Sequence, residues 1–286
     1  MFDLRYHVAS LAAVFIALIL GIVIGVGLAG SGVTNEADLK VAREQRDNYR
    51  ADAQAYKEQR DQFRKSAGAF SRAYPAVMHD LLVGKRIALV FVGPVHGGIA
   101  GAVDSALTDA GTRPAIRTVS LKLPIDVEAI DNALAAQGPQ VEQYIGDDKL
   151  TALGAALGSE FVRGGDTPLW KALRSQLIEE GAGNARQRAD GVVVVRSARP
   201  QAGDTARFLR GLYTGLASAD VPAVGVEETG ATPSAVSTFE DRGLSSVDDV
   251  DFDTGRAALA LLLAGAPKGH YGVRDDADAI LPPTGG

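Results

Sequence analysis

The chain contains no cysteine. That absence excludes a disulfide framework, an iron–sulfur centre and thiolate metal sites, while it leaves the redox state of the surroundings open. Methionine and histidine are scarce too, with two and four residues respectively. Soft metal ions prefer thiolate and thioether ligands, so the sequence offers little to bind them. We therefore predict no cofactor and no metal-binding residue.

Clustered cations are also lacking over most of the chain. Residues 1–83 carry ten Lys and Arg against nine Asp and Glu, whereas residues 84–286 carry nineteen against twenty-six. The second stretch is therefore acidic by seven charges and accounts for the net charge of −6. Because nucleic acids are bound by clustered Lys and Arg, no nucleic-acid partner is expected.

Charged, amide and proline side chains are absent from the 22 residues between Val8 and Ala29. As a helix rising about 1.5 Å per residue, this run reaches about 33 Å, enough to cross a hydrocarbon core of roughly 30 Å. The run predicts one retained transmembrane helix. The alternative is a cleaved signal peptide, for which Gly27-Leu28-Ala29 offers a small-x-small site, but the run is longer than such peptides usually have.

Two glycines in this run, Gly21 and Gly25, share one helical face. Small residues at this spacing let membrane helices approach closely, so we predict a dimerisation contact there; the alternative is that a helix in lipid merely tolerates them. The orientation stays open from charge alone. One cation, Arg5, precedes the run and several follow it, which would keep the large part in the cytoplasm, but the following cations alternate with acidic residues.

Glycine and proline are absent from residues 36–65, which hold fifteen charged residues. This composition predicts a long exposed helix. Apolar residues recur in it at a period of seven, at Ala42, Tyr49, Tyr56, Phe63 and Phe70. Sustained heptads indicate a coiled coil or a helical partner, and the alternative is a solvated helix leaning on its own domain. We predict a homodimeric stalk that ends at Pro75.

The remainder of the chain alternates apolar strand patterns with helical patterns, bounded by Gly and Pro. Strands are expected at residues 85–92, 115–121, 191–195 and 223–226, and helices at 98–110, 127–136, 150–157, 168–180, 205–218 and 254–263. Continuous Val, Ile and Leu runs interleaved with helices indicate a parallel sheet covered on both faces. We predict an α/β domain with a Rossmann-like, doubly wound, mostly parallel sheet of four or five strands.

Three regions therefore follow from these patterns. Residues 1–34 form the N-terminal segment with the transmembrane helix, residues 35–74 the coiled-coil stalk, and residues 75–286 the α/β domain. The domain is expected to end in a disordered tail from Leu281, where the chance pattern L-P-x-T-G is not followed by the apolar span of a sorting signal.

Ligands of open α/β sheets often bind where the strands end, so the turn Gly93–Gly101 is a candidate. It lacks the G-x-G-x-x-G spacing, no acidic residue ends the second strand to hold a ribose, and no Lys-Ser or Lys-Thr follows Gly98. We expect a turn whose glycines let the helix pack closely on the sheet, and no bound nucleotide.

The acidic run Asp248–Asp253 suggests calcium at first sight. In an EF-hand alignment, however, Thr254 stands at the glycine position and Ala260 at the bidentate glutamate position. We expect instead that Asp253 or Thr254 caps the helix that begins there. Nucleophile elbows and H-E-x-x-H motifs are absent, and His96 and His270 are expected to be surface residues, so the sequence predicts no enzyme and no catalytic residue.

Several segments resemble the actinobacterial MctB family, named for mycobacterial copper transport protein B. They are MFDLRYHVASLAAVFIALILGIVIG at the start, the heptad stalk, and the late stretches GLSSVDDVD (243–251), GRAAL (255–259) and GHYGV (269–273). The resemblance implies an envelope protein with a cytoplasmic amino end and an extracytoplasmic α/β domain. The family name implies copper export. The corynebacterial relatives, called SteB, imply partnership with a cytoplasmic SteA-type protein in division and envelope assembly.

A single apolar span satisfies its own backbone but encloses no aqueous path, and nothing polar within it would line one. We therefore expect a single-pass, dimeric membrane protein whose α/β domain acts as a scaffold for envelope or cell-division partners. The alternative is a copper efflux component that forms an oligomeric channel, as the family name implies.

Overall fold

The computed structural model describes residues 17–18, 36–112 and 115–283, without the side chains of helical residues 36–43, 55–56 and 58–67. The predicted span Val8–Ala29, with Gly21 and Gly25, therefore lies outside the described residues except at Ala17 and Leu18. Within the described ranges, no helix is both long and apolar enough to cross a membrane. The chain divides into two units, residues 1–66 and 67–286.

Helix α2, Glu36–Met78, covers 43 residues and confirms the long helix expected from the charged, glycine-free stretch. Tyr49 is 75% exposed on it. The side chains of Tyr56 and Phe63 belong to those that the structure does not describe. The pairing of two such helices stays a prediction.

Pro75 does not end the helix as predicted; α2 continues to Met78. A proline inside a helix removes one backbone hydrogen bond, which usually breaks the helix. Here the last turns are held by packing within the second unit. Tyr74 and Met78 are buried in its core, and Phe70 packs against that core with its ring edge-on to Tyr74, at 6.4 Å between centroids.

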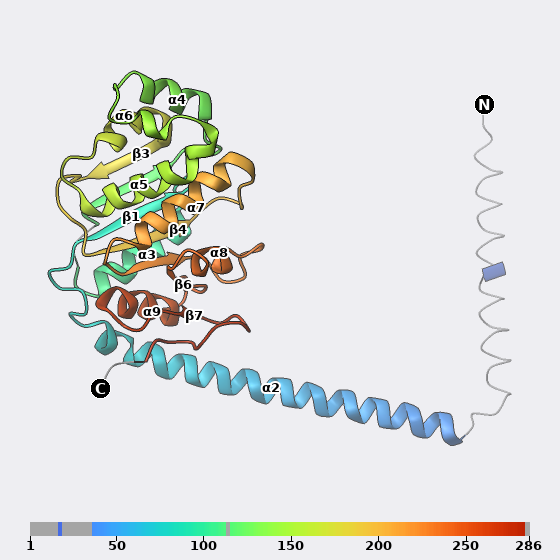
Figure 1. Ribbon diagram of the computed structural model, residues 1–286. Helices are drawn as coiled ribbons and strands as arrows, with labels where there is room; N and C mark the ends of the chain where they lie inside the picture. Colours follow the sequence, from blue (N-terminus) through green and yellow to red (C-terminus); the bar gives the residue numbers. More distant parts are fainter. Residues whose placement is uncertain (1–16, 19–35, 113–114, 284–286) are drawn as a thin grey trace, which may run out of the picture. The chain divides into compact units, whose positions relative to one another are not determined.

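The second unit alternates strands and helices (Figure 1). The elements after α2 are β1 Ile87–Val92, α3 Gly97–Asp109, β2 Arg117–Leu121, α4 Val127–Ala135, α5 Leu150–Arg163, α6 Pro168–Leu177, β3 Ile178–Gly183, β4 Gly191–Arg196, α7 Gly203–Ala217, β5 Ala223–Val226, α8 Val236–Glu240, β6 Ser245–Val247, α9 Asp253–Ala264 and β7 His270–Tyr271. Short 3-10 turns at Glu142–Tyr144 and Asp147–Lys149 precede α5.

The strands form one sheet in the order β3-β2-β1-β4-β5-β6-β7. All neighbouring pairs are parallel except β2 and β3. The mostly parallel sheet is as predicted, but the described sheet has seven strands instead of four or five. The missed strands are β3, which the sequence pattern continues as helix, and the short strands β6 and β7, which lack an apolar run.

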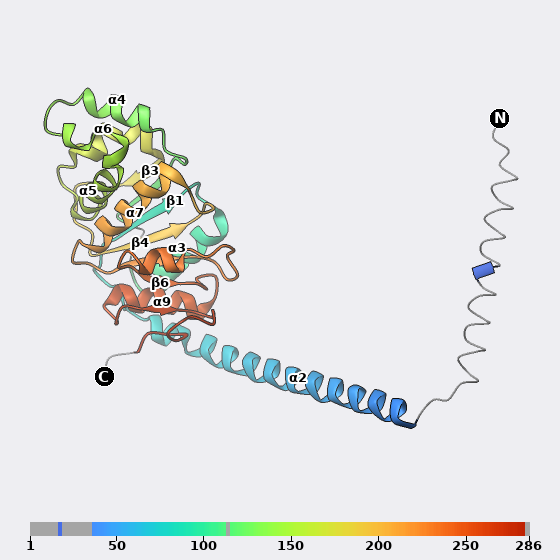
Figure 2. The same ribbon diagram turned by 45° about the vertical axis from the view of Figure 1, so that its right-hand side comes forward.

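Helices cover both faces of the sheet, which confirms the doubly wound architecture (Figures 1 and 2). Alternate residues of β1 point to opposite cores, because side chains alternate along a strand. Ala88 and Val90 join the core under α4, α5, α6, α7 and α8. Leu89 and Phe91 join the core formed with α3, α9 and the end of α2.

Helices α5 and α7 lie side by side on one face (Figures 1 and 2). Each presents a pair of glycines four residues apart to the other, Gly154 and Gly158 from α5 and Gly211 and Gly215 from α7. A Cβ atom added at Gly215 would lie 2.1 Å from the backbone oxygen of Ala155. The helix backbones are therefore in direct contact, and a side chain at these positions would push them apart.

The prediction that a disordered tail begins at Leu281 is wrong for that residue. Leu281 packs against the core that includes Tyr271, and Ala279 pairs with Tyr271 in an isolated bridge. Apolar contact therefore orders the chain to this point, and residues 284–286 lie outside the described part.

Candidate functional site

The order of the strands reverses at β1, which lies between β2 and β4. In doubly wound sheets, the crevice at such a switch point is the usual ligand site. Here the loops after β1 and β4 meet there. The Ser197 hydroxyl donates to the Val92 carbonyl at 3.2 Å, and a Cβ atom at Gly93, whose φ is +108°, would lie 2.6 Å from Cβ of Ala198. The crevice is therefore narrow directly above β1.

The glycine turn after β1 differs in detail from the expectation. A Cβ atom at Gly97 or Gly101 would meet nothing within 4 Å, so these glycines are not required for close packing of the helix on the sheet. At Gly98 it would lie 2.9 Å from the carboxylate of Glu228. The close approach that needs glycine is between the loops, at Gly93.

Beside the narrowed crevice, a cavity of about 560 Å³ opens between the end of β4, α7 and the start of α8. We call it the carboxyl-edge pocket. Four arginines contribute to its lining, Arg196, Arg199, Arg207 and Arg210. Sequence reasoning missed these residues, although four arginines within the fifteen residues that follow the strongest apolar strand are a readable signal.

Two of these arginines are already neutralised by the chain. Nη1 of Arg196 lies 3.1 Å from Oε2 of Glu227, with side chains 10% and 2% exposed, and Arg207 is paired with Asp204. Glu227 also accepts hydrogen bonds from the Ser234 hydroxyl at 2.5 Å and the Ala235 amide at 2.8 Å. The buried Arg196–Glu227 pair therefore joins the ends of β4 and β5 to the segment that enters α8.

A buried carboxylate–imidazole pair lies at the end of β6. Oδ2 of Asp248 is 2.6 Å from Nε2 of His270, and their side chains are 1% and 2% exposed. Asp248 also accepts from the Val273 amide at 2.9 Å. The expectation that His270 is a surface residue is therefore wrong, because Asp248, 22 residues earlier in the chain, supplies a charged partner inside the fold.

Burial disfavours the charged forms of both groups, but their mutual hydrogen bond and charge outweigh it. The pKa of His270 is therefore raised and that of Asp248 lowered. Both residues belong to the late stretches that carry the family resemblance. The pair fastens β7 and the following segment to the end of β6.

The neighbouring carboxylates face different partners. Oδ2 of Asp249 accepts from the Thr254 hydroxyl at 2.7 Å, and Oδ1 of Asp251 accepts from the Thr229 amide at 2.8 Å. The residue before α9 is Phe252, which makes no capping bond, so neither Asp253 nor Thr254 is the cap that we predicted. Asp253 lies in the first turn and pairs with Arg256.

Potential ligands for a soft metal ion are separated in the fold. Met78 is fully buried in the core, His270 is held by Asp248, and His96 is exposed before α3. His79 is exposed beside Asp80, with 3.1 Å between Nδ1 and Oδ2. Among the residues that the structure describes, no three His, Asp or Glu side chains converge in a metal-binding arrangement.

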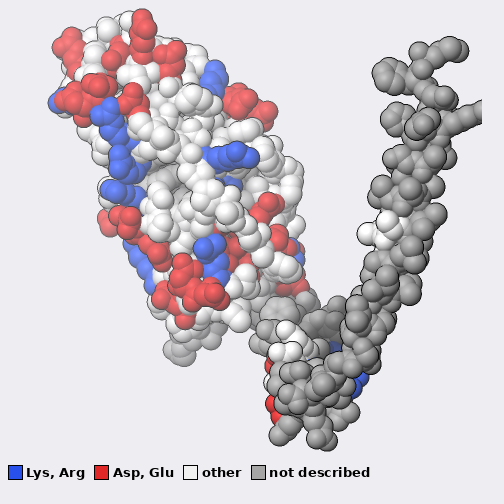
Figure 3. All heavy atoms as spheres, turned by 90° about the vertical axis from the view of Figure 1, so that its right-hand side faces the viewer, with Lys and Arg blue, Asp and Glu red and all other residues white. Residues whose placement is uncertain are grey.

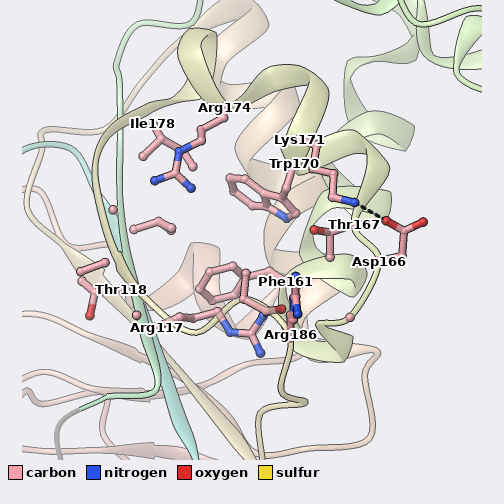
Figure 4. A pocket seen from close by; sticks show the side chains of 16 residues that line it. Arg117, Thr118, Phe161, Asp166, Thr167, Trp170, Lys171, Arg174, Ile178 and Arg186 are labelled. Atoms are coloured by element: carbon pink, nitrogen blue, oxygen red, sulfur yellow. Dashed lines mark hydrogen bonds and ion pairs between the residues drawn. The ribbon is translucent and has the colours of Figure 1, made fainter.

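A second cavity, of about 590 Å³, lies between β2, β3, α6 and the end of α5 (Figure 4). We call it the edge pocket, because β3 is the last strand of the sheet. Phe161 and Trp170 supply aromatic walls, and cationic side chains surround them. These cations are Arg117, Lys171, Arg174 and Arg186. No pattern in the sequence predicts this site, because its residues come from four separate elements.

Charge is unevenly distributed over the surface. On the face shown in Figure 3, Lys and Arg run in a band down one side of the domain, while Asp and Glu gather toward its two ends. The acidic excess of this part of the chain therefore coexists with basic local surface.

The structure describes only some of the residues predicted for dimerisation. Tyr49 is exposed on α2, whereas Phe70 packs against the core of its own unit. Gly21 and Gly25 lie outside the described residues, as do the side chains of Tyr56 and Phe63.

Comparison with known proteins relates nearly the whole chain to one group. A family model described as "Copper transport outer membrane protein, MctB" matches residues 1–282. "Copper transporter MctB" of Mycobacterium tuberculosis (strain ATCC 25618 / H37Rv) is 26% identical over 318 residues, covering 98% of this chain and 99% of the relative. The protein of the same name from Mycobacterium leprae is 31% identical over 325 residues, covering 99% and 100%.

Proposed function

The chain belongs to the MctB family, and from this premise we propose that the protein takes part in copper transport at the cell envelope. The observation that carries the proposal is the match of the family model to residues 1–282, which include the apolar run, the helix α2 and the α/β unit. The mycobacterial relatives are named copper transporters, and the similarity to them covers nearly their full length. Copper is the cargo in this proposal.

In this proposal the α/β unit acts by binding and not by catalysis. Its buried histidine is held by Asp248, and its buried methionine, Met78, packs in the apolar core. In this proposal, both side chains stabilise the fold and do not bind copper. The two pockets are the concave surfaces of the same unit. The run Val8–Ala29 serves as the single-pass anchor, with the amino end in the cytoplasm and the α/β unit outside.

A second candidate is a dimeric scaffold for envelope or cell-division proteins, including a cytoplasmic SteA-type partner. The observation that favours it is the exposure of Tyr49, 75%, on a long helix with a heptad pattern. An aromatic ring on a charged helix gains by packing against a second helix, because burial removes apolar surface from water.

The test compares a strain lacking the gene with its parent and with a strain complemented by the full chain. Growth is measured over a range of copper concentrations, and cellular copper by mass spectrometry, with zinc as the control metal. We expect the deletion strain to accumulate copper and to lose growth at high copper, with zinc content unchanged. Equal copper content and equal growth in all strains would overturn the transport proposal, and a division defect that copper does not affect would favour the scaffold.

The role of α2 is tested in the same strain. Residues 36–66 are replaced by an unrelated helix of equal length, while the anchor and the α/β unit are kept. Restored copper resistance assigns transport to the anchor and the α/β unit. Loss of resistance, with the protein present in membranes at the normal level, assigns it to pairing through α2.

A further inference from the structure

The edge pocket is built like a ligand site. Its volume of about 590 Å³ lies within the range of roughly 300–1,000 Å³ that small-molecule sites occupy. Arg174 from α6 and Arg117 from β2 line the cavity together with the adjoining rings of Phe161 and Trp170 (Figure 4). We propose that the edge pocket binds a small organic anion that carries a flat apolar group. This assignment is independent of copper transport.

The aromatic walls are fixed in place. Trp170 is 8% exposed, and its indole Nε1 donates a hydrogen bond to the Leu157 carbonyl at 2.7 Å. The Phe161 ring packs against it, with 5.7 Å between centroids. Because the rings are held before a ligand arrives, stacking a flat group on them costs little ordering of side chains. These walls provide the apolar part of the site.

Arg117 provides the buried positive charge. The residue is 4% exposed, and its guanidinium lies 5.5 Å from the centroid of the Phe161 ring. Nη1 donates to the Ala185 carbonyl at 3.0 Å and Nη2 to the Gln187 carbonyl. Its Nε has no hydrogen-bond partner among the described residues. Burial lowers the pKa of Arg117, which is the cost of a charge without a counter-ion.

An anionic group in the pocket would lower that cost, because it would balance a charge that the two carbonyl groups only solvate. Hydrogen bonds from the cationic side chains of the rim to such a group are charge-assisted, and these are about twice as strong as neutral ones. A carboxylate or phosphate group is therefore the chemistry that completes this part of the pocket.

The rim of the pocket adds further cations. Arg174 and Arg186 are exposed and make no ion pair with any residue in the described ranges. Lys171 pairs with the one acidic lining residue, Asp166, at 2.5 Å. The lining therefore carries four cations and one carboxylate, in a chain whose net charge is −6. This local reversal of sign selects for anions.

Trp170 makes the pocket directly observable, because it is the single tryptophan of the chain. The full chain, purified in detergent, is titrated with phenyl phosphate while tryptophan emission is followed under selective excitation. Benzyl alcohol and benzylamine serve as neutral and cationic probes of similar size. We expect a saturable change with phenyl phosphate, and at least about tenfold weaker effects with the other two probes, since 1.4 kcal/mol corresponds to a factor of ten.

Two exposed variants test the rim without disturbing the core. Arg174→Gln should weaken phenyl phosphate binding about tenfold, the loss of one charge-assisted contact. Arg199→Gln removes an exposed arginine from the carboxyl-edge pocket and should leave the affinity unchanged. Equal responses of Trp170 to the three probes, or an unchanged affinity in Arg174→Gln, would overturn the assignment.

Arg117→Met tests the buried charge, since methionine keeps a long unbranched side chain and removes the positive charge. Its affinity for phenyl phosphate should fall more than that of Arg174→Gln, with the circular dichroism spectrum of the native protein retained. If this variant does not fold, Arg174→Gln and the probe series still decide the question. A folded Arg117→Met protein with native affinity would count against the site.

Discussion

Two adjacent aspartates after β6 show how strongly local surroundings set the charge of a side chain. Asp248 has the His270 ring and backbone amides as partners, and its pKa is lowered although burial acts the other way. Asp249 is fully buried with one hydroxyl partner, Thr254, and its Oδ1 has no partner among the described residues. Burial raises the pKa of Asp249 to about 6, and the charges of Asp248 and Asp251 add to that rise.

At the residue scale, this predicts a specific dependence of stability on pH. A carboxyl group whose pKa is higher in the folded state destabilises the fold once it is ionised. The cost begins as pH rises through the unfolded pKa, near 4, and is complete above about 6. Asp249→Asn removes this cost. Relative to the wild type, its free energy of unfolding should therefore gain about 2 kcal/mol between pH 4 and pH 7, since each pKa unit corresponds to about 1.4 kcal/mol and part of the cost is already present at pH 4.

The measurement is urea unfolding followed by circular dichroism at pH 4 and pH 7. Asp104→Asn is the matched control, because Asp104 is exposed on α3 and is not one of the charges that raise the pKa of Asp249. The difference between that variant and the wild type should not grow with pH in this way. An Asp249→Asn protein destabilised equally at both pH values would show that the carboxylate is not strained by its burial.

At the scale of elements, the contact between α5 and α7 depends on four glycines. Gly215→Ala would place a Cβ atom 2.1 Å from the Ala155 carbonyl oxygen, so the helices must separate. We expect the free energy of unfolding to fall by at least about 2 kcal/mol, as for an overpacked core. Gly101→Ala, at an exposed site of α3 with nothing within 4 Å of the added atom, should raise it by up to about 1 kcal/mol, because alanine favours helix.

Urea unfolding of the two variants decides the matter, since both make the same chemical change in a helix. A stabilised Gly215→Ala protein would mean that α5 and α7 do not touch as described. From the G-x-x-x-G spacing, a close contact between helices is predicted only within the apolar run, at Gly21 and Gly25. The structure shows the same spacing used between helices of the α/β unit.

The elements that could be predicted from the sequence are those whose own pattern decides their structure. The run Gly191–Val195 is apolar throughout, and β4 is buried along nearly its whole length. In contrast, β3 has the sequence IEEGAG and becomes a strand through its antiparallel pairing with β2. The strands β6 and β7 have three and two residues, too few for any periodicity, and pairing with their neighbours defines them.

The candidate sites were harder to predict for a related reason. The four cations of the edge pocket come from β2, α6 and the segment after β3, and no spacing in the sequence connects them. His270 lies in the short glycine-containing stretch GHYGV, which does not indicate burial. Its burial depends on Asp248, 22 residues earlier in the chain. Distances of this kind are set by the order of the strands in the sheet, which the sequence pattern did not specify.

At the scale of the whole molecule, the prediction concerns the pairing of two chains through α2. The heptad pattern places Tyr49 on the predicted seam, and its ring is 75% exposed in the single chain. Ala51, two residues later, points about 200° away around the helix, since each residue turns by about 100°. A coiled coil would therefore bring two copies of residue 49 together and keep two copies of residue 51 apart.

We predict that Tyr49→Cys chains can be joined by a short bismaleimide reagent in membranes at native expression, whereas Ala51→Cys chains are joined much less. The cysteine-free sequence makes each introduced thiol the single reactive site of the chain. The fraction of covalent dimer is read by immunoblot, and dilution of the membranes with lipid separates stable pairs from chance collisions. Equal cross-linking at the two positions, or none at residue 49, would exclude a seam through Tyr49, because a coiled coil requires one helical face to meet its partner.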